Sequence, residues 1–143
     1  MSNDRKTRIL FICIGNMCRS PMAEGFACHL GGDLVEVYSA GTRPTGVVSE
    51  DSIYMMDELD IDISHQRSNS LRSVPLEEID IAISMAPDTA ASLMPPGFKG
   101  RAIDWAVDDP IASSLNTFRR VRDEIEAHVR ALLDEIRSEK TPS

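Results

Sequence analysis

Short apolar runs alternate along this chain with segments in which apolar residues recur every three or four positions. The apolar runs, which are typical of buried strands, cover residues 8–13, 34–40, 79–85 and 101–106. The helical patterns cover residues 20–30, a segment that begins at Ser49, a short segment after Asp88, and residues 115–136. Because strands that alternate with helices form parallel sheets covered on both faces, we expect an α/β fold with three α/β/α layers and a four-stranded parallel sheet.

Two of the expected helices carry local start signals. Ser20 followed by Pro21 is typical of an N-cap residue and the first helical position, and Gly31 would end that helix. Asp88 is expected to cap a short helix that ends before Pro95. The last helix has the clearest pattern, with apolar residues at three-four spacing: Leu115, Phe118, Val121, Ile125, Val129, Leu132 and Ile136.

Length and charge narrow the classes of function. The 143 residues fit a single domain, residues 1–143, with an ordered core of about 7–137 between polar ends. The 15 basic and 23 acidic residues give a net charge of −8 without a basic stripe, so nucleic-acid binding is not expected. No apolar stretch approaches the ~20 residues that cross a bilayer, so no membrane association is expected. Because no secretory signal precedes the three cysteines, we expect free thiols in the cytoplasm.

The segment from Cys13 to Ser20 lies between the first predicted strand and the first predicted helix. A loop at such a junction gathers backbone N–H groups into one concavity, and the helix N-terminus adds positive potential. This potential favours the thiolate form of a cysteine, and an arginine fork holds two oxygens of a tetrahedral oxyanion. The pattern predicts a nucleophile, Cys13, in an anion-binding loop formed by Ile14, Gly15, Asn16, Met17, Cys18, Arg19 and Ser20.

The extended sequence around this loop resembles the signature of the low-molecular-weight protein tyrosine phosphatases. The similarity covers residues 13–24 and continues through residues 39–42, residues 61–65 and the pair Asp109-Pro110. The related thioredoxin-coupled arsenate reductases share this fold and loop. The resemblance implies an enzyme that needs no cofactor and no metal.

The resemblance also implies roles for individual residues. Cys13 would attack phosphorus and form a phosphocysteine intermediate, while Arg19 and the loop amides stabilise the charge on the oxygens. Ser20 would donate a hydrogen bond to the sulfur. Asp109 would protonate the leaving oxygen and then act as the base, and Asp108 is the alternative acid.

Further residues are expected to support the loop or its redox state. By resemblance, a network of Ser39, Asn16 and His65 would brace the loop. Cys18 would either pack in the interior or form a reversible disulfide with Cys13 that protects the nucleophile. Cys28, on the first helix, is expected to pack in the core.

Two enzymatic functions and one non-enzymatic function remain open. The main expectation is a phosphatase that acts on a phosphorylated protein or a small phosphoester and releases inorganic phosphate, because Pro21 favours that branch. Ile111, where tyrosine phosphatases often carry an aromatic residue, weakens a preference for phosphotyrosine. The alternative is an arsenate reductase, and because residues 84–93 hold no cysteine it would need an external low-molecular-weight thiol, or Cys18. A non-enzymatic oxyanion-binding module would not need Cys13, Arg19 and Asp109 together.

Overall fold

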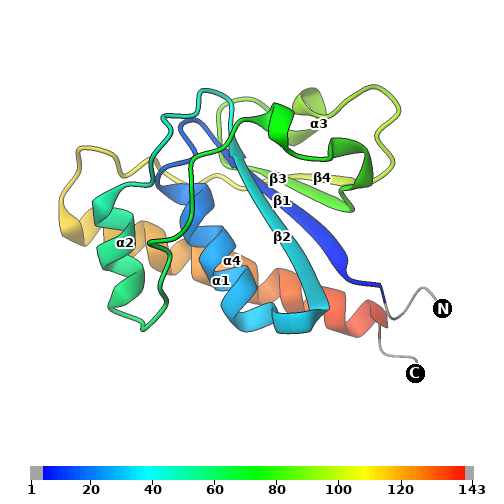
Figure 1. Ribbon diagram of the computed structural model, residues 1–143. Coiled ribbons are helices and arrows are strands. Elements are labelled where there is room, and N and C mark those ends of the chain that lie inside the picture. The colour runs from blue at the N-terminus through cyan, green and yellow to red at the C-terminus, as the bar shows by residue number, and fades with distance from the viewer. Residues whose placement is uncertain (1–4, 141–143) are drawn as a thin grey trace.

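A four-stranded parallel sheet forms the centre of the computed structural model, which describes residues 5–140 (Figure 1). The strands are β1 (Thr7–Cys13), β2 (Val35–Gly41), β3 (Ile81–Ser84) and β4 (Arg101–Asp104). Their order across the sheet is β2-β1-β3-β4, and every neighbouring pair is parallel. The prediction of a four-stranded parallel sheet is therefore confirmed, and β1 lies in its interior.

Helices cover the two faces of the sheet unequally. Figure 1 shows α1 (Arg19–Gly31) and α4 (Leu115–Lys140) on one face, and α2 (Glu50–Asp57) packs against both of them. The other face carries the short helix α3 (Ala90–Leu93) and two 3-10 turns at 71–73 and 76–78. The predicted three α/β/α layers are confirmed.

The alternation of side chains along β1 divides the interior into two apolar cores. Ile9 and Phe11 point toward α1 and α4, whereas Leu10 and Ile12 point toward α3, and all four are fully buried. A strand that is buried on both faces reads as a continuous apolar run, which explains why its pattern in the sequence is so plain. These two cores fix the carboxyl end of β1 and therefore the start of the loop that follows it.

The predicted helix start at Ser49 is confirmed, because Ser49 is the N-cap of α2 and its hydroxyl accepts from the Asp51 N–H. The predicted caps at Ser20 and Asp88 are wrong. Helix α1 begins at Arg19 and its N-cap is Cys18, so Ser20 lies inside the first turn. The hydroxyl of Ser20 contacts the Cys13 sulfur and the Asn16 amide instead of capping the helix. Helix α3 is capped by Thr89, whose hydroxyl accepts from the Ser92 N–H, and not by Asp88.

The predicted element boundaries also shift. Strand β3 is shorter at both ends than the apolar run 79–85 predicted. Strand β4 begins at Arg101 as predicted but ends at Asp104, before the predicted end at residue 106. Helix α4 continues to Lys140, beyond the predicted end of the ordered core at residue 137, and Lys140 donates a hydrogen bond to the Arg5 carbonyl. The outermost residues of the two polar ends, residues 1–4 and 141–143, lie outside the described residues.

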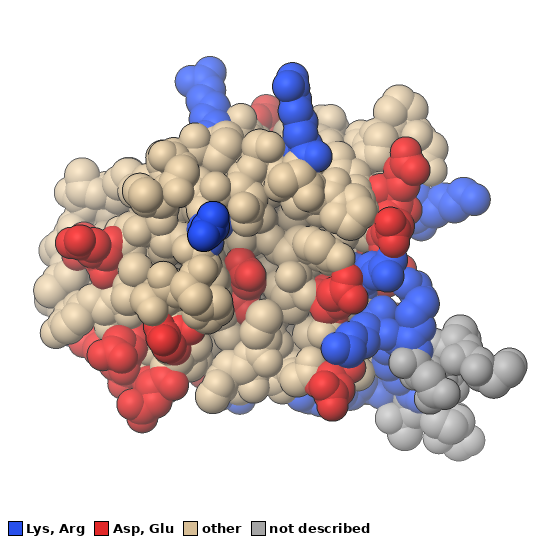
Figure 2. Space-filling model, in the orientation of Figure 1, with Lys and Arg blue, Asp and Glu red and all other residues tan. Residues whose placement is uncertain are grey.

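The surface mixes charges of both signs. Figure 2 shows acidic side chains gathered over α2 and basic side chains mostly at the opposite end of the same face. Within residues 5–140, no helix is long and apolar enough to span a membrane. A negatively charged protein of this kind needs local positive groups wherever it binds an anion.

An ion-pair network that joins α2 to α4 predicts a pH-dependent contribution to stability. The Glu58 carboxylate accepts from Arg119 and from the buried Arg122, at 2.7 Å each, and these hydrogen bonds lower the pKa of Glu58 to about 2. A carboxylate whose pKa is depressed on folding stabilises the protein above its ordinary value of 4.5 and loses that effect as the pH falls toward 2. We therefore expect Glu58→Gln to lower the melting temperature at pH 7, with the difference from wild type vanishing near pH 2.

Thermal unfolding at a series of pH values measures this effect. Glu77→Gln is the matched control, because Glu77 is an exposed carboxylate outside this network. An equal loss of melting temperature for Glu58→Gln at pH 2 and pH 7 would contradict the assignment.

Candidate active site

The Cys13–Ser20 loop lies at the carboxyl edge of the sheet, where β1 meets the N-terminus of α1 (Figure 1). Ligands of parallel sheets bind at this edge. The structure brings Cys13, Arg19 and Asp109 together around a cavity of about 150 Å³. The remaining lining residues come from the loop and from two neighbouring segments: Ile14, Gly15, Met17, Cys18, Arg43, Thr45 and Ile111.

Four loop carbonyls are turned outward and held by the segment that follows β2. The pairs, donor first, are Thr42 N to Cys13 O (3.1 Å), Arg43 N to Ile14 O (2.7 Å), Thr45 N to Gly15 O (3.1 Å) and Ser49 N to Met17 O (2.9 Å). Because these carbonyl oxygens point away from the cavity, the loop N–H groups are left for its concave side, as in other anion-binding nests. No pattern in the sequence predicted that this segment supports the loop.

Gly41 at the end of β2 makes this close approach possible. A Cβ at this position would lie 2.6 Å from the Ile14 carbonyl oxygen and 2.8 Å from the Asn16 nitrogen, and neither backbone atom can move cheaply. We expect Gly41→Ala to displace the loop and to lower turnover about 100-fold, since a shift of about 1 Å at a reacting centre has an effect of this size.

Steady-state kinetics and thermal unfolding, measured together, test this expectation. Gly31→Ala is the matched control, because its added methyl meets only the side chains of Val35 and Leu133 at the far end of α1. We expect that control to change stability alone. Wild-type turnover in Gly41→Ala would show that the loop tolerates the methyl group.

Hydrogen bonds inside the loop orient the Cys13 sulfur. The Asn16 amide donates to the Ser20 hydroxyl at 2.8 Å, and that hydroxyl lies 2.9 Å from the Cys13 sulfur. Since Ser20 accepts from Asn16, its own proton is directed to the sulfur. Asn16 is fully buried with a φ of 50°, a conformation that Asn tolerates better than most residues. Its side-chain oxygen Oδ1 accepts from the Asn69 backbone N–H at 2.6 Å.

The Arg19 guanidinium is buried and aimed by backbone carbonyls. Its Nη1 donates to the carbonyls of Met85 and Val107, which belong to the segments after β3 and β4. Its Nη2 lies 3.6 Å from an Asp109 carboxylate oxygen. Its Nε is buried and finds no acceptor within the described part of the chain, so a donor remains for an oxygen of a bound anion.

The two neighbouring aspartates point in different directions. The Asp109 carboxylate lines the cavity, is 39% exposed, and accepts from the Ile111 N–H at 3.1 Å. The Asp108 carboxylate is 75% exposed and pairs with Arg120 of α4 at 3.2 Å. The geometry therefore favours Asp109 over Asp108 as the group that exchanges a proton with a ligand in the cavity, and its catalytic role stays a prediction.

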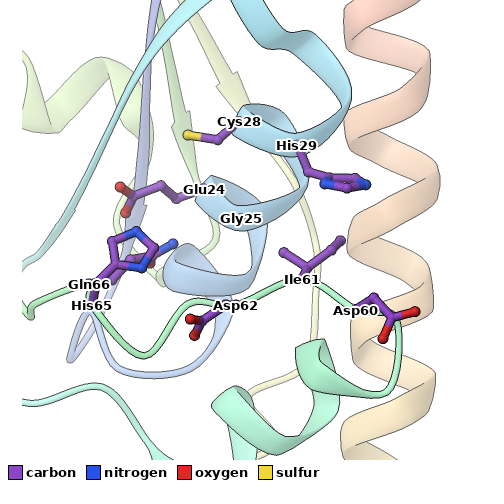
Figure 3. A pocket seen from close by; sticks show the side chains of 9 residues that line it. All are labelled: Glu24, Gly25, Cys28, His29, Asp60, Ile61, Asp62, His65 and Gln66. Atoms are coloured by element: carbon purple, nitrogen blue, oxygen red, sulfur yellow. The ribbon is translucent and has the colours of Figure 1, made fainter.

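The side chains of Ser39 and His65 do not make the bracing contacts that the resemblance implied. The Ser39 hydroxyl donates to the Glu24 carboxylate at 2.5 Å. His65 lines a separate pocket beside α1, together with Glu24 and Cys28 of that helix. Figure 3 shows the His65 ring next to the Glu24 side chain. Burial raises the pKa of Glu24, while the Ser39 hydrogen bond and His65 oppose the rise.

Ser68 and Asn69 brace the loop instead. The Ser68 hydroxyl donates to the Gly15 carbonyl at 2.8 Å, and the Asn69 side chain donates to the Ser39 carbonyl at 3.4 Å, in addition to the backbone contact with Asn16. The sequence carried no signal for these residues, because each reaches a partner 30 or 53 positions away.

All three cysteines are free thiols. Cys18 is buried, which raises its pKa to about 11 even though the hydroxyls of Ser52 and Ser49 oppose the rise. The prediction that Cys28 packs in the core is wrong, because its side chain is exposed at the pocket of Figure 3. Partial desolvation there and the Glu24 carboxylate raise the pKa of Cys28 to about 11. The Cys13–Cys18 disulfide stays a prediction.

No metal-binding cluster is found in residues 5–140, where no three His, Cys, Asp or Glu side chains are placed to hold an ion. The site therefore presents a thiol, a buried guanidinium, backbone N–H groups and one carboxylate. This set can hold a tetrahedral oxyanion, attack its central atom and protonate a departing oxygen.

Known proteins share the fold and much of the sequence. The family model "Low molecular weight phosphotyrosine protein phosphatase" matches residues 8–141. Arsenate reductase 2 of Staphylococcus saprophyticus is 39% identical over 133 residues, which is 92% of this chain and 98% of that protein. The arsenate reductase of Staphylococcus aureus is 40% identical over 124 residues, 85% of this chain and 92% of that protein.

Solved structures agree with these sequence matches. "An arsenate reductase in the phosphate binding state" superposes with a TM-score of 0.80 and 34% identity, covering 91% of this chain and 98% of that one. The YwlE arginine phosphatase from Geobacillus stearothermophilus superposes with a TM-score of 0.82 and 25% identity, covering 94% and 95%. The chain belongs to the low molecular weight phosphotyrosine protein phosphatase family.

Proposed function

We propose that this enzyme reduces arsenate to arsenite through a covalent adduct on Cys13, with an external low-molecular-weight thiol as the reductant. The observation that carries the proposal is the cavity above Cys13. It measures about 150 Å³, and the described residues that line it include no aromatic side chain. Ile111, Thr45 and Met17 form its walls, so it suits a small tetrahedral oxyanion, and its own lining offers no ring to stack on a phosphotyrosine. Trp105 lines an adjoining groove and not this cavity.

The sequence relatives support the same choice. Curated arsenate reductases are 38–42% identical to this chain. Among solved structures, arsenate reductases are 33–34% identical and two phosphatases of the same fold are 25% and 28% identical. The main expectation from the sequence, phosphate monoester hydrolysis, is therefore less well supported than its alternative.

In the first step the Cys13 sulfur forms a bond to arsenic. The hydroxyl oxygen of monohydrogen arsenate takes a proton from Asp109 and leaves as water, while Arg19 and the loop N–H groups neutralise the charge on the remaining oxygens. The Ser20 hydroxyl, 2.9 Å from the sulfur, stabilises the thiolate before attack and again when it leaves.

The second step needs another sulfur, and the described cysteines are unsuited to supply it. Cys18 is buried, and its pKa of about 11 leaves almost no thiolate at neutral pH. Cys28 lines the separate pocket beside α1 (Figure 3). Residues 84–93, which follow β3 toward the site, contain no cysteine. The reductant therefore comes from outside the chain.

The electrons balance with two external thiols. The first thiol gives its proton to Asp109 and bonds to arsenic, and the bond from arsenic to Cys13 breaks with its electron pair returning to the sulfur. A second thiol then attacks the sulfur of the released adduct. A disulfide forms, the electron pair of the sulfur–arsenic bond stays on arsenic, and As(V) becomes As(III). Two thiols and one arsenate give one disulfide, one arsenite and one water.

Hydrolysis of phosphate monoesters is the second candidate, and the contact between the Ser20 hydroxyl and the Cys13 sulfur favours it. A hydroxyl that stabilises the departing thiolate serves a phosphocysteine intermediate equally well. Water would then take the place of the thiol, with Asp109 as its base and inorganic phosphate as the product. Ile111, 50% exposed at the rim, would contact the ester group.

A side-by-side assay on one preparation separates the two functions. We expect arsenite to form from arsenate only when glutathione is added, with a kcat/KM above that for p-nitrophenyl phosphate at mildly acidic pH. Hydrolysis of the aryl phosphate without any thiol-dependent arsenite formation would overturn the proposal in favour of a phosphatase. Cys18→Ala tests the internal alternative: loss of arsenite formation in that variant, with the fold intact, would make Cys18 the second sulfur.

A further inference from the structure

An open groove adjoins the Cys13 cavity on the side of Asp109. It measures about 420 Å³ and shares Ile14, Arg19 and Asp109 with the smaller cavity. Its other wall comes from the segments after β3 and β4: Met85, Ala86, Pro87, Trp105, Ala106, Val107 and Asp108. The cavity itself accounts for the oxyanion, so the larger groove is free for a second reactant.

The wall formed by residues 85–87 is held in place by hydrogen bonds. The Arg19 guanidinium donates to the Met85 carbonyl. The Ser84 hydroxyl donates to the Asp88 carbonyl at 2.6 Å and accepts from the Ala86 N–H at 3.2 Å. A wall that is fixed before binding loses little conformational entropy when a ligand arrives, which favours the affinity of a small molecule.

Trp105 gives the groove a fixed aromatic surface. Its ring stacks on His128 of α4, with centroids 4.7 Å apart and planes 17° apart. Its other neighbour is Phe11 of β1, at 5.8 Å between centroids. Trp105 is the one tryptophan of the chain, so a change in tryptophan emission reports on the surroundings of this one side chain, which lines the groove.

We propose that this groove binds the external thiol, a low-molecular-weight thiol of about tripeptide size. The inference rests on the proposed arsenate reduction, in which a sulfur must approach arsenic from the side opposite Cys13 and transfer its proton to Asp109. The groove opens at that carboxylate and at Arg19. Its volume falls in the range of about 300–1,000 Å³ that is typical of small-molecule sites. None of the three cysteines lines it, so it offers no protein thiol of its own.

A fluorescence titration with S-methylglutathione tests the site without requiring any turnover. This analogue has the size of the proposed ligand and lacks the reactive thiol. We expect a saturable change in Trp105 emission for the wild type, and a dissociation constant at least tenfold higher for Ala86→Glu, which adds bulk and charge to the groove wall. Pro87→Glu, at the exposed edge of the same wall, is the second variant and is expected to act in the same direction.

Ala91→Glu is the matched control, since Ala91 is exposed on α3 outside the groove and the substitution adds the same charge. We expect its dissociation constant to stay within twofold of the wild type. The inference is overturned if the wild type shows no saturable change, or if Ala86→Glu and Ala91→Glu bind the analogue equally well.

Kinetics with arsenate then separate this inference from the function on which it rests. With arsenate saturating, Ala86→Glu is expected to raise the KM for glutathione at least tenfold, and Ala91→Glu to leave it unchanged. Arsenite formation with equal KM values for glutathione in both variants would overturn the proposal that the groove binds the thiol, and would leave the proposed function supported. Binding of the analogue by an enzyme that forms no arsenite would leave the groove in place and overturn the proposed function.

Discussion

Replacing Cys13 by Ser is expected to abolish turnover, by a factor on the order of 10⁴ or more, while phosphate binding stays within a few-fold of the wild type. The sulfur is the only atom of the site that forms a covalent bond in either candidate reaction, and a serine hydroxyl is not ionised at neutral pH. The anion is held by Arg19 and by the loop N–H groups, which the substitution leaves in place. The Ser20 contact, 2.9 Å to the sulfur, can be kept by a serine oxygen.

Isothermal titration with inorganic phosphate and a turnover assay on the same sample measure both effects. Cys28→Ser is the matched control, because Cys28 is exposed on α1 and lines a different pocket (Figure 3). We expect that control to retain turnover within twofold. Substantial activity in Cys13→Ser would rule out the covalent mechanism for both candidate functions.

Replacing Asp109 by Asn is expected to lower turnover about 10²- to 10³-fold, because a positioned general acid contributes an effect of this size. The carboxylate lines the cavity, 3.6 Å from the Arg19 guanidinium. The loss should be greatest where the departing oxygen is most basic, as it is for arsenate and for alkyl phosphates. It should be smaller for p-nitrophenyl phosphate, whose leaving group is stable without protonation.

A series of aryl phosphates with leaving groups of increasing pKa measures this dependence. Asp108→Asn is the matched control, since the Asp108 carboxylate pairs with Arg120 on α4. Its leaving-group dependence should follow that of the wild type. A steep dependence in Asp108→Asn together with a wild-type profile in Asp109→Asn would transfer the acid role to Asp108.

Local sequence patterns predicted the site well where a single segment carries the chemistry. Cys13 and Arg19 are fixed within one loop, so their spacing and the flanking strand and helix were sufficient to place them at the carboxyl edge of the sheet. The prediction of an N-cap at Ser20 was wrong because the pattern Ser20-Pro21 is also satisfied by a serine inside the first turn of the helix. Its hydroxyl is drawn to the Cys13 sulfur and the Asn16 amide, a local contact that cap statistics do not contain.

The sequence by itself determined the layered fold, because the alternation of apolar runs and helical periods follows from which side chains avoid water. It also predicted Cys13 as the nucleophile and Arg19 as the anion-binding fork. Only the tertiary structure decided what holds them, since the bracing groups meet the loop through long-range hydrogen bonds. The donors are the Ser68 hydroxyl, the Asn69 backbone N–H and backbone N–H groups of the segment after Gly41. The tertiary structure also decided which aspartate faces the cavity, and it formed the groove beside Trp105 from segments that are remote in sequence. Chain folding creates such sites by bringing separate strand ends to one edge, and no local pattern records that meeting.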